Sequence, residues 1–406
     1  MGEDQDTHTP EEALEQVWGA LRDHYPLMEY LGAFRDPSRD VWLEEFRPRV
    51  RQARSLTEAF PIIEELVLRF QDCHTTLQWP GKPRRTRPPI RLGWVEGGVA
   101  VLRATDETGL YPGDRVTAID GRDPVDAIRD AWPHVSGAHP EGHVQGALDH
   151  LIGGSPGSEL TIGTLRGAVH LLRPQSPTEQ PPQEPVSLRT LDDGETVVLR
   201  IRTWGGDELV QRLDGLLEQA RYAPYLVLDV RGNRGGYDEA ARALVGRFIR
   251  RPLVCSIGLC RITATNRYES SVAICHPRGP WTYGGRTAVL ADVDCHSACV
   301  HFVAAMAASR IACIVGQPTD GAGGWMQRVE LPCGAVLVCS RMFPIDGGTG
   351  GWPSMLHGTR PHIPALPTLT DLAAGRDTAL QTAVAWLRSG QDIPVTGHEV
   401  TEVVLS

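Results

Sequence analysis

An apolar stretch, a short turn with one serine and an alanine-rich segment follow one another between Ala288 and Ala308. The first stretch has the composition of a buried strand and the last that of a helix, so the pattern predicts a strand that leads through Ser297 into a helix. A hydroxyl at such a turn lies beside helix N–H groups and the positive end of the helix dipole. The pattern favours an α/β fold, with Ser297 either as a helix cap or as a nucleophile.

A second strand-like run, Tyr225–Val230, ends in a cluster of glycines. Without a Cβ, Gly232, Gly235 and Gly236 can take positive φ and point N–H groups at an anion or an oxyanion. The segment has neither the Walker lysine nor the G-x-G-x-x-G spacing, so phosphate binding is the weaker interpretation.

A histidine lies just after the third informative segment, an amphipathic helix predicted over Leu56–Phe70. His74 stands in the sequence Asp-Cys-His-Thr at the end of that helix. Imidazole can take up a proton near neutral pH, which makes His74 a candidate general base. Histidines at helix ends are more often capping or core residues, so the position alone leaves both interpretations open.

The order of these motifs resembles that of the tail-specific (C-terminal processing) protease superfamily. D-x-H-T at 72–75 and L-D-x-R-x-N-x-G-G at 228–236 precede the serine turn, and V-G-x-x-T-x-G at 315–321 and G-x-x-P at 358–361 follow it. Bacterial members use a lysine about 25 residues after the serine, where this chain has Ala322. The tricorn core and interphotoreceptor-retinoid-binding-like branch, which uses histidine, is therefore the closest fit.

This resemblance implies a serine peptidase-like hydrolase. Ser297 would attack a carbonyl and His74 would take its proton as general base. The N–H groups of Ala298 and of Gly235 or Gly236 would stabilise the oxyanion.

Tricorn-type members orient the histidine with a serine beside it and a glutamate before the closing motif. These places hold Cys73 and Met355 in this chain. An imidazole without an acceptor on its second nitrogen loses control of its tautomer. The candidates for the orienting role are Cys73, Asp72, Ser354, Asp346 and His357.

The resemblance also implies an α/β, crotonase-like (ClpP-like) layered catalytic domain, an N-terminal helical region and a small PDZ-like β-rich domain. The PDZ-like motif is Gly109-Leu-Tyr-Pro-Gly-Asp, followed by a strand with Val116 and Ile119. Five prolines mark a linker. The predicted divisions are a helical region 1–85, a PDZ-like domain 86–173, a Pro-rich linker 174–185, a catalytic domain 186–390 and a tail 391–406. The strands expected in the catalytic layer are 196–201, 225–230, 287–291, 311–315 and 335–340.

Composition limits the kinds of partner that we expect this protein to bind. A net charge of −10 disfavours nucleic acid, and no run is apolar enough for a membrane span. The first residues are acidic, unlike a signal peptide, which predicts a cytoplasmic protein. Nine cysteines, an odd number in a large chain, predict reduced thiols. The run Cys295-His-Ser-Ala-Cys-Val-His lacks the paired C-x-x-C of a structural zinc site, so we expect no metal and no cofactor.

The most probable substrate on these grounds is a peptide or a related acyl compound. Two alternatives stay open at this level. The chain could be a repurposed acyl-transfer or cyclising enzyme of specialised metabolism, or a non-catalytic relative that binds an apolar ligand. The residues do not specify the oligomeric state.

Overall fold

The computed structural model describes residues 8–28, 39–177, 183–262, 267–346 and 357–394. The fold is mixed α/β, as predicted, with several separate sheets and hydrophobic cores. No helix within these ranges is both long and apolar enough to span a membrane. The predicted tail falls largely outside the described residues, as does the middle of the predicted linker.

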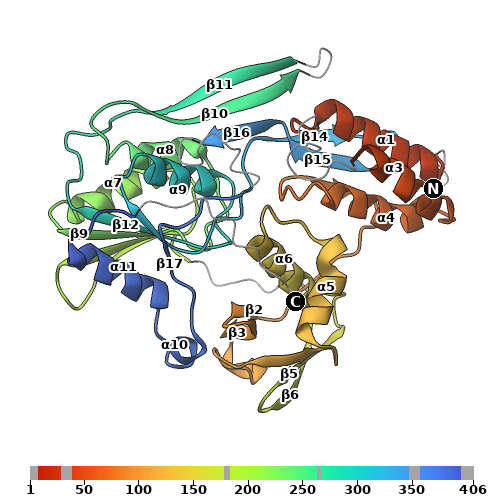
Figure 1. The fold of residues 1–406 in the computed structure, drawn as a ribbon, viewed down its shortest axis with the longest axis horizontal. Coiled ribbons are helices and arrows are strands. Elements are labelled where there is room, and N and C mark those ends of the chain that lie inside the picture. Colours follow the sequence, from red (N-terminus) through yellow and green to blue (C-terminus); the bar gives the residue numbers. More distant parts are fainter. Residues whose placement is uncertain (1–7, 29–38, 178–182, 263–266, 347–356, 395–406) are drawn as a thin grey trace.

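Among the described residues, three helices form the N-terminal region (Figure 1). The first begins with a capping box between Thr9 and Glu12 and has Pro10 in its first turn. The three pack around aromatic side chains, in which Tyr25 and Trp42 both contact Phe70 edge to face. Their bounds are α1 (Pro10–His24), α3 (Arg39–Arg51) and α4 (Leu56–Leu68).

The predicted strand 335–340 forms as β15 (Val336–Ser340), but its expected place in the catalytic layer is wrong. It lies between β1 (Thr76–Gln78) and β14 (Met326–Glu330) in a small antiparallel sheet beside the N-terminal helices. Its alternate residues Leu337 and Cys339 are fully buried in the core of those helices. The alternation of apolar residues determines which face of a strand is buried, but it does not determine which strands or helices that face packs against.

A central module follows β1 and has a core of its own. Two strands form a hairpin, three more form a sheet, and two helices cover them. The predicted strand with Val116 and Ile119 forms here as β4. The elements are β2 (Ile90–Val95), β3 (Gly98–Ala104), the 3-10 turn Asp106–Thr108, β4 (Val116–Ile119), α5 (Pro124–Ala131), the 3-10 turn Trp132–His134, α6 (Pro140–Ile152), β5 (Glu159–Thr164) and β6 (Gly167–Leu172).

The main sheet has the strand order β17-β13-β12-β9-β8-β7. All neighbours are parallel except β7 and β8. Helices α7, α8 and α9 cover one face, and α11 covers the other (Figure 1). The bounds are β7 (Val186–Thr190), β8 (Thr196–Ile201), α7 (Leu209–Gln219), β9 (Tyr225–Asp229), α8 (Asp238–Val245), β12 (Arg286–Ala291), α9 (Ala298–Ala308), β13 (Cys313–Gly316), β17 (Ile363–Pro364), α10 (Leu369–Ala373) and α11 (Thr378–Ser389).

Parallel pairing of β9, β12 and β13 brings the three turns that follow these strands to one edge of the sheet. The turns are bonded to one another: the N–H of His296 donates to the carbonyl of Asn233 at 3.0 Å, and the N–H of Asp320 donates to that of Cys295 at 3.1 Å. The glycine turn, the serine turn and the turn around Asp320 therefore form one surface.

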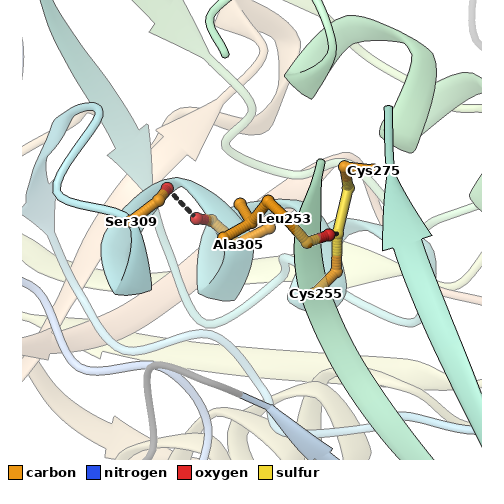
Figure 2. The surroundings of a disulfide bond; sticks show 5 residues. All are labelled: Leu253, Cys255, Cys275, Ala305 and Ser309. Atoms are coloured by element: carbon orange, nitrogen blue, oxygen red, sulfur yellow. Dashed lines mark hydrogen bonds between the residues drawn. A yellow bond between two sulfur atoms is a disulfide. The ribbon is translucent and has the colours of Figure 1, made fainter. Parts of the chain in front are cut away.

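A third sheet contains the long strands β10 (Leu253–Ile262) and β11 (Arg267–Cys275), with β16 (Met342–Asp346) along β10. The pair projects over α8 and α9 (Figure 1). A disulfide joins Cys255 to Cys275 where the hairpin meets α9 (Figure 2). The prediction of reduced thiols is wrong at these two cysteines, because strand pairing brings together residues that are 20 apart in the sequence.

Candidate active site

Ser297 has an unusual backbone conformation, with φ 56° and ψ −125°. It directly precedes α9, but its side chain does not cap the helix. Its own N–H donates to the carbonyl of Ala322 at 3.0 Å. A non-glycine residue with positive φ costs about 1–3 kcal/mol and persists only where its surroundings hold it. The turn therefore holds the Ser297 hydroxyl away from a capping role, with the residue half-buried and its backbone strained at the sheet edge.

Gly235 lies directly against this serine. A Cβ added at Gly235 would stand 2.7 Å from the Cβ of Ser297 and 3.2 Å from the nitrogen of Ala298, so only glycine fits. The N–H of Gly235 donates to Oδ1 of Asn233 at 2.9 Å. Among the hydrogen bonds of the described residues, the N–H groups of Gly236 and Ala298 have no acceptor. Of the predicted oxyanion donors, these two are available.

Asn233 holds the two turns together. It is fully buried, and its Nδ2 donates to the carbonyl of Ile201 at 3.2 Å while its own carbonyl accepts from His296. The asparagine of the glycine-rich motif thus fixes the glycine turn to β8 and to the serine turn at the same time.

The His74 side chain is buried, with 2% of the residue exposed. Neither ring nitrogen has a hydrogen-bond partner among the described residues. Its backbone N–H donates to Oδ1 of Asp72 at 2.9 Å. Burial disfavours the charged form and lowers the pKa of His74. The ring is therefore held in the neutral form that can accept a proton.

The predicted orienting residues lie in different places. The Asp72 carboxylate accepts from the hydroxyls of Thr75 (2.7 Å) and Ser340 (2.8 Å), so it fixes the turn and not the ring. The Cys73 thiol donates to the carbonyl of Ser136 at 3.7 Å, and burial raises its pKa. Ser354 lies outside the described residues, as does the side chain of Asp346 at the end of β16, and His357 is exposed.

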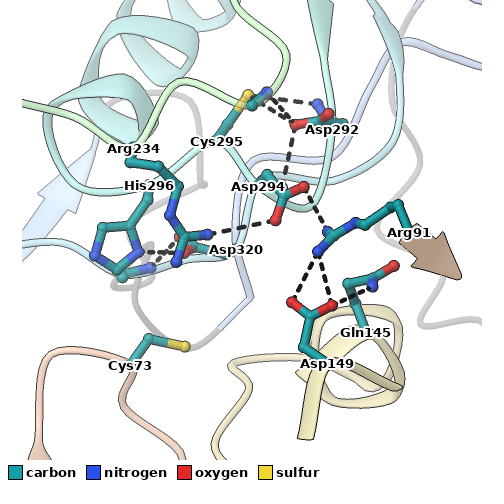
Figure 3. A network of polar contacts seen from close by, with 12 residues as sticks. Cys73, Arg91, Gln145, Asp149, Arg234, Asp292, Asp294, Cys295, His296 and Asp320 are labelled. Carbon is teal, nitrogen blue, oxygen red and sulfur yellow. Dashed lines mark hydrogen bonds and ion pairs between the residues drawn. The ribbon is translucent and has the colours of Figure 1, made fainter. Parts of the chain in front are cut away.

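A second histidine with an acidic partner lies beside His74, and the sequence analysis missed it. The rings of His74 and His296 meet edge to face, with centroids 4.8 Å apart and planes at 83°. Nδ1 of His296 bonds to the carboxylate of Asp320 (Figure 3). The available signal was positional: His296 precedes the serine, and Asp320 follows β13, the neighbour of β12.

The known proteins that this chain resembles agree with this geometry. Residues 195–363 match the model of Peptidase family S41. That stretch includes all three turns of the candidate site, so this part of the chain resembles an S41 peptidase domain. It is 28% identical over 306 residues to the putative tricorn protease homolog 2 of Streptomyces coelicolor, which covers 72% of this chain. The alignment covers only 24% of that relative's length, so the chain spans about a quarter of it.

Solved structures share the fold. Mature CPAF superposes with a TM-score of 0.75 at 15% identity, over 96% of this chain and 99% of that one. The photosystem II D1 C-terminal processing protease gives a TM-score of 0.51 at 17% identity, over 92% of this chain and 99% of that one. These two likenesses show a shared fold, and the family match over residues 195–363 together with the tricorn protease homolog confirms the predicted resemblance to the tail-specific proteases.

The cysteines near the serine of the S41 domain do not form a metal site with the histidines. The thiols of Cys295 and Cys299 both donate to the carbonyl of Val230, at 3.3 and 3.8 Å, and His296 bonds to Asp320. In the part of the chain that the structure describes, no group of three or more His, Cys, Asp or Glu could hold a metal ion.

The central module bonds to the turns of the S41 domain. Arg91 on β2 donates to Asp149 of α6 at 2.8 Å and to Asp294 in the serine turn at 2.5 Å (Figure 3). Nε2 of the buried His139 lies 2.7 Å from the carbonyl oxygen of Thr319, before Asp320. Two of the three site turns are therefore braced from outside the main sheet.

Proposed function

We propose that this protein is a serine peptidase of the tail-specific type. The observation that supports this most is the strained Ser297 beside two unpaired N–H groups, those of Ala298 and Gly236. Pre-set N–H donors at a developing oxyanion are a major source of rate in acyl transfer.

In this proposal Oγ of Ser297 attacks the peptide carbonyl carbon while its proton passes to His74. The two N–H groups bind the oxyanion. The imidazolium then gives the proton to the leaving amine as the C–N bond breaks, leaving an acyl-enzyme. Water hydrolyses the ester and returns Ser297 to its starting state, with His74 again as the base.

We further propose the finer architecture implied by the resemblance. The helix-covered parallel sheet is the crotonase-like layer of a catalytic domain over 186–390. The gathering of the three site turns at one edge of this sheet supports that assignment. The central module is the PDZ-like domain over 86–173, supported by its separate core and by the strand of Val116 and Ile119.

A cavity of about 390 Å³ lies beside α8, α9 and the β10–β11 hairpin, with Asp238, His301 and Ala305 among the residues that line it. Ser297, Gly236 and His74 do not line this cavity, so it is separate from the proposed reacting groups.

The test is reaction of the purified protein with a fluorophosphonate probe, with the adduct located by mass spectrometry. We expect a single adduct, on Ser297. Hydrolysis of an unfolded protein such as casein would then identify the bond class. Folded protein that the probe does not label would contradict the proposal.

Replacement of His74 by alanine is expected to slow labelling by at least about a hundredfold, the effect of losing a general base. The measurement is the second-order rate constant for probe labelling at pH 8. Since Asp72 binds the backbone of residue 74 and not the ring, the turn should stay in place in the variant, which circular dichroism and thermal unfolding would check. Labelling at the wild-type rate would remove His74 from the mechanism.

The pH profile should extend further into acid than an ordinary histidine allows. Labelling needs neutral His74, so the rate falls as the pH drops through its pKa. Burial lowers that pKa, which places the half-maximal rate below the usual value of about 6.5. The rate constant measured between pH 4.5 and 8.5 on folded protein tests this, and a midpoint at or above 6.5 would contradict it.

A further inference from the structure

The proposed base lacks the partner that a catalytic histidine usually has. Both ring nitrogens of His74 are buried, and no side chain bonds to them; only the backbone carbonyl of Gly323 acts on the ring as an acceptor. Buried polar atoms are nearly always paired more firmly than this. During acylation the ring would become positively charged in this dry position. A buried positive charge is costly unless a negative group lies near it. Something other than a bonded carboxylate must therefore fix the ring and balance the charge.

The His296–Asp320 pair is in the right place to do both. The His296 ring packs edge to face against that of His74, and its Nδ1 bonds to Asp320. Both partners are well shielded, with side chains 18% and 9% exposed. The charged or titratable groups that act on His74 from the surrounding elements are Asp72, His296 and Asp320. Of the two carboxylates Asp72 acts on His74 more strongly, and its bonds to the hydroxyls of Thr75 and Ser340 hold it in place without removing its charge.

We propose that His296, held by Asp320, positions the His74 ring, and that the Asp320 carboxylate acts together with that of Asp72 to compensate the charge on His74 when it takes the serine proton. The pair would take the place of the orienting glutamate of related sites. This inference rests on the proposed function. No proton leaves His296 in this scheme, so both members are positioning residues.

The backbone around Asp320 supports this role, because it also fixes the nucleophile. Oδ1 of Asp320 accepts from the N–H of Ala322 at 2.9 Å, and the carbonyl of Ala322 accepts from the N–H of Ser297. One turn therefore sets both the serine backbone and the partner of His74. A substitution at residue 320 must keep the bond from the N–H of Ala322 if it is to test the bond between residue 320 and His296.

Asp320→Asn meets that requirement, since its amide oxygen can still accept from Ala322 while the negative charge is lost. We expect it to lower the rate constant for fluorophosphonate labelling at least about tenfold, a modest part of what an orienting acid contributes in known triads. His296→Phe keeps an aromatic ring but loses the bond to Asp320, and should lower the rate similarly. The matched control is Asp214→Asn on α7, which removes a carboxylate paired with Arg278 and should label at the wild-type rate.

Combining Asp320→Asn with His74→Ala shows whether the His296–Asp320 pair acts through the His74 ring. In the His74→Ala background, Asp320→Asn should cause less than about a twofold further loss, because the two substitutions share one effect. A tenfold loss in both backgrounds would overturn the proposal, since the pair would then act on Ser297 directly. Labelling at the wild-type rate in both single variants, Asp320→Asn and His296→Phe, would also overturn the proposal. Should Asp320→Asn not fold, the same cycle with His296→Phe decides the question.

The pH profile gives a second readout that a mere packing defect would not change. Loss of a charge beside His74 should move the midpoint of the labelling profile in Asp320→Asn, whereas looser packing would lower the plateau at an unchanged midpoint. An unchanged midpoint would contradict the proposal. Failure of the proposed function is distinct, because wild-type Ser297 would then not be labelled at all.

Discussion

Ser297→Ala is expected to abolish both fluorophosphonate labelling and peptide hydrolysis, and to leave the fold intact. The hydroxyl makes no hydrogen bond within the described residues and does not cap α9, so its removal leaves no buried group unpaired. Alanine keeps the same Cβ and hence nearly the same backbone strain. Loss of a nucleophile removes the acyl-enzyme route altogether, a loss of about a millionfold in well-studied serine enzymes.

The measurement is labelling and casein hydrolysis by wild type and variant at equal concentration, with thermal unfolding as the check on folding. The thermal unfolding midpoints of the wild type and of Ser297→Ala should agree within a few degrees. Labelling of folded Ser297→Ala at another residue would show that the chemistry lies elsewhere.

Gly235→Ala is the second substitution from which we expect a very large effect. The new Cβ would stand 2.7 Å from the Cβ of Ser297 and 2.8 Å from the carbonyl oxygen of His296, at a φ of +94°. Both neighbours belong to the serine turn, so the turn must move. Loss of one oxyanion donor costs about a hundred- to a thousandfold, and this shift displaces the donors relative to the nucleophile. We expect at least that loss of labelling, with a lower melting temperature.

Gly232→Ala is the matched control. Its φ is +71°, but no atom lies within 4 Å of the added Cβ. It therefore carries a similar backbone penalty without the collision. Labelling should fall far less in Gly232→Ala than in Gly235→Ala. Equal losses in the two variants would show that backbone strain, and not the contact with Ser297, accounts for the effect.

Local patterns predicted the elements of the site well. The serine turn, the glycine turn and the helix before His74 form where apolar periodicity and turn residues place them. Contacts between distant segments were not predictable in this way. The partner of β15, the disulfide of the long hairpin and the contact of His74 with His296 all depend on how strands pair in space.

The orienting group is the clearest case. The candidates were sought beside the histidine and near the closing motif, where related proteins have them. The ring that meets His74 comes instead from the residue before the serine, and its acidic partner comes from the next strand of the sheet. No single motif contains that arrangement, because it arises from the parallel neighbours β12 and β13.

The hydrogen bond between Ser340 and Asp72 joins residues 268 positions apart. Together with the pairing of β1 and β15, it anchors the turn that carries His74. The strand that anchors this turn follows Ser297 in the sequence, so both proposed catalytic residues are synthesised before the turn of His74 gains its anchor.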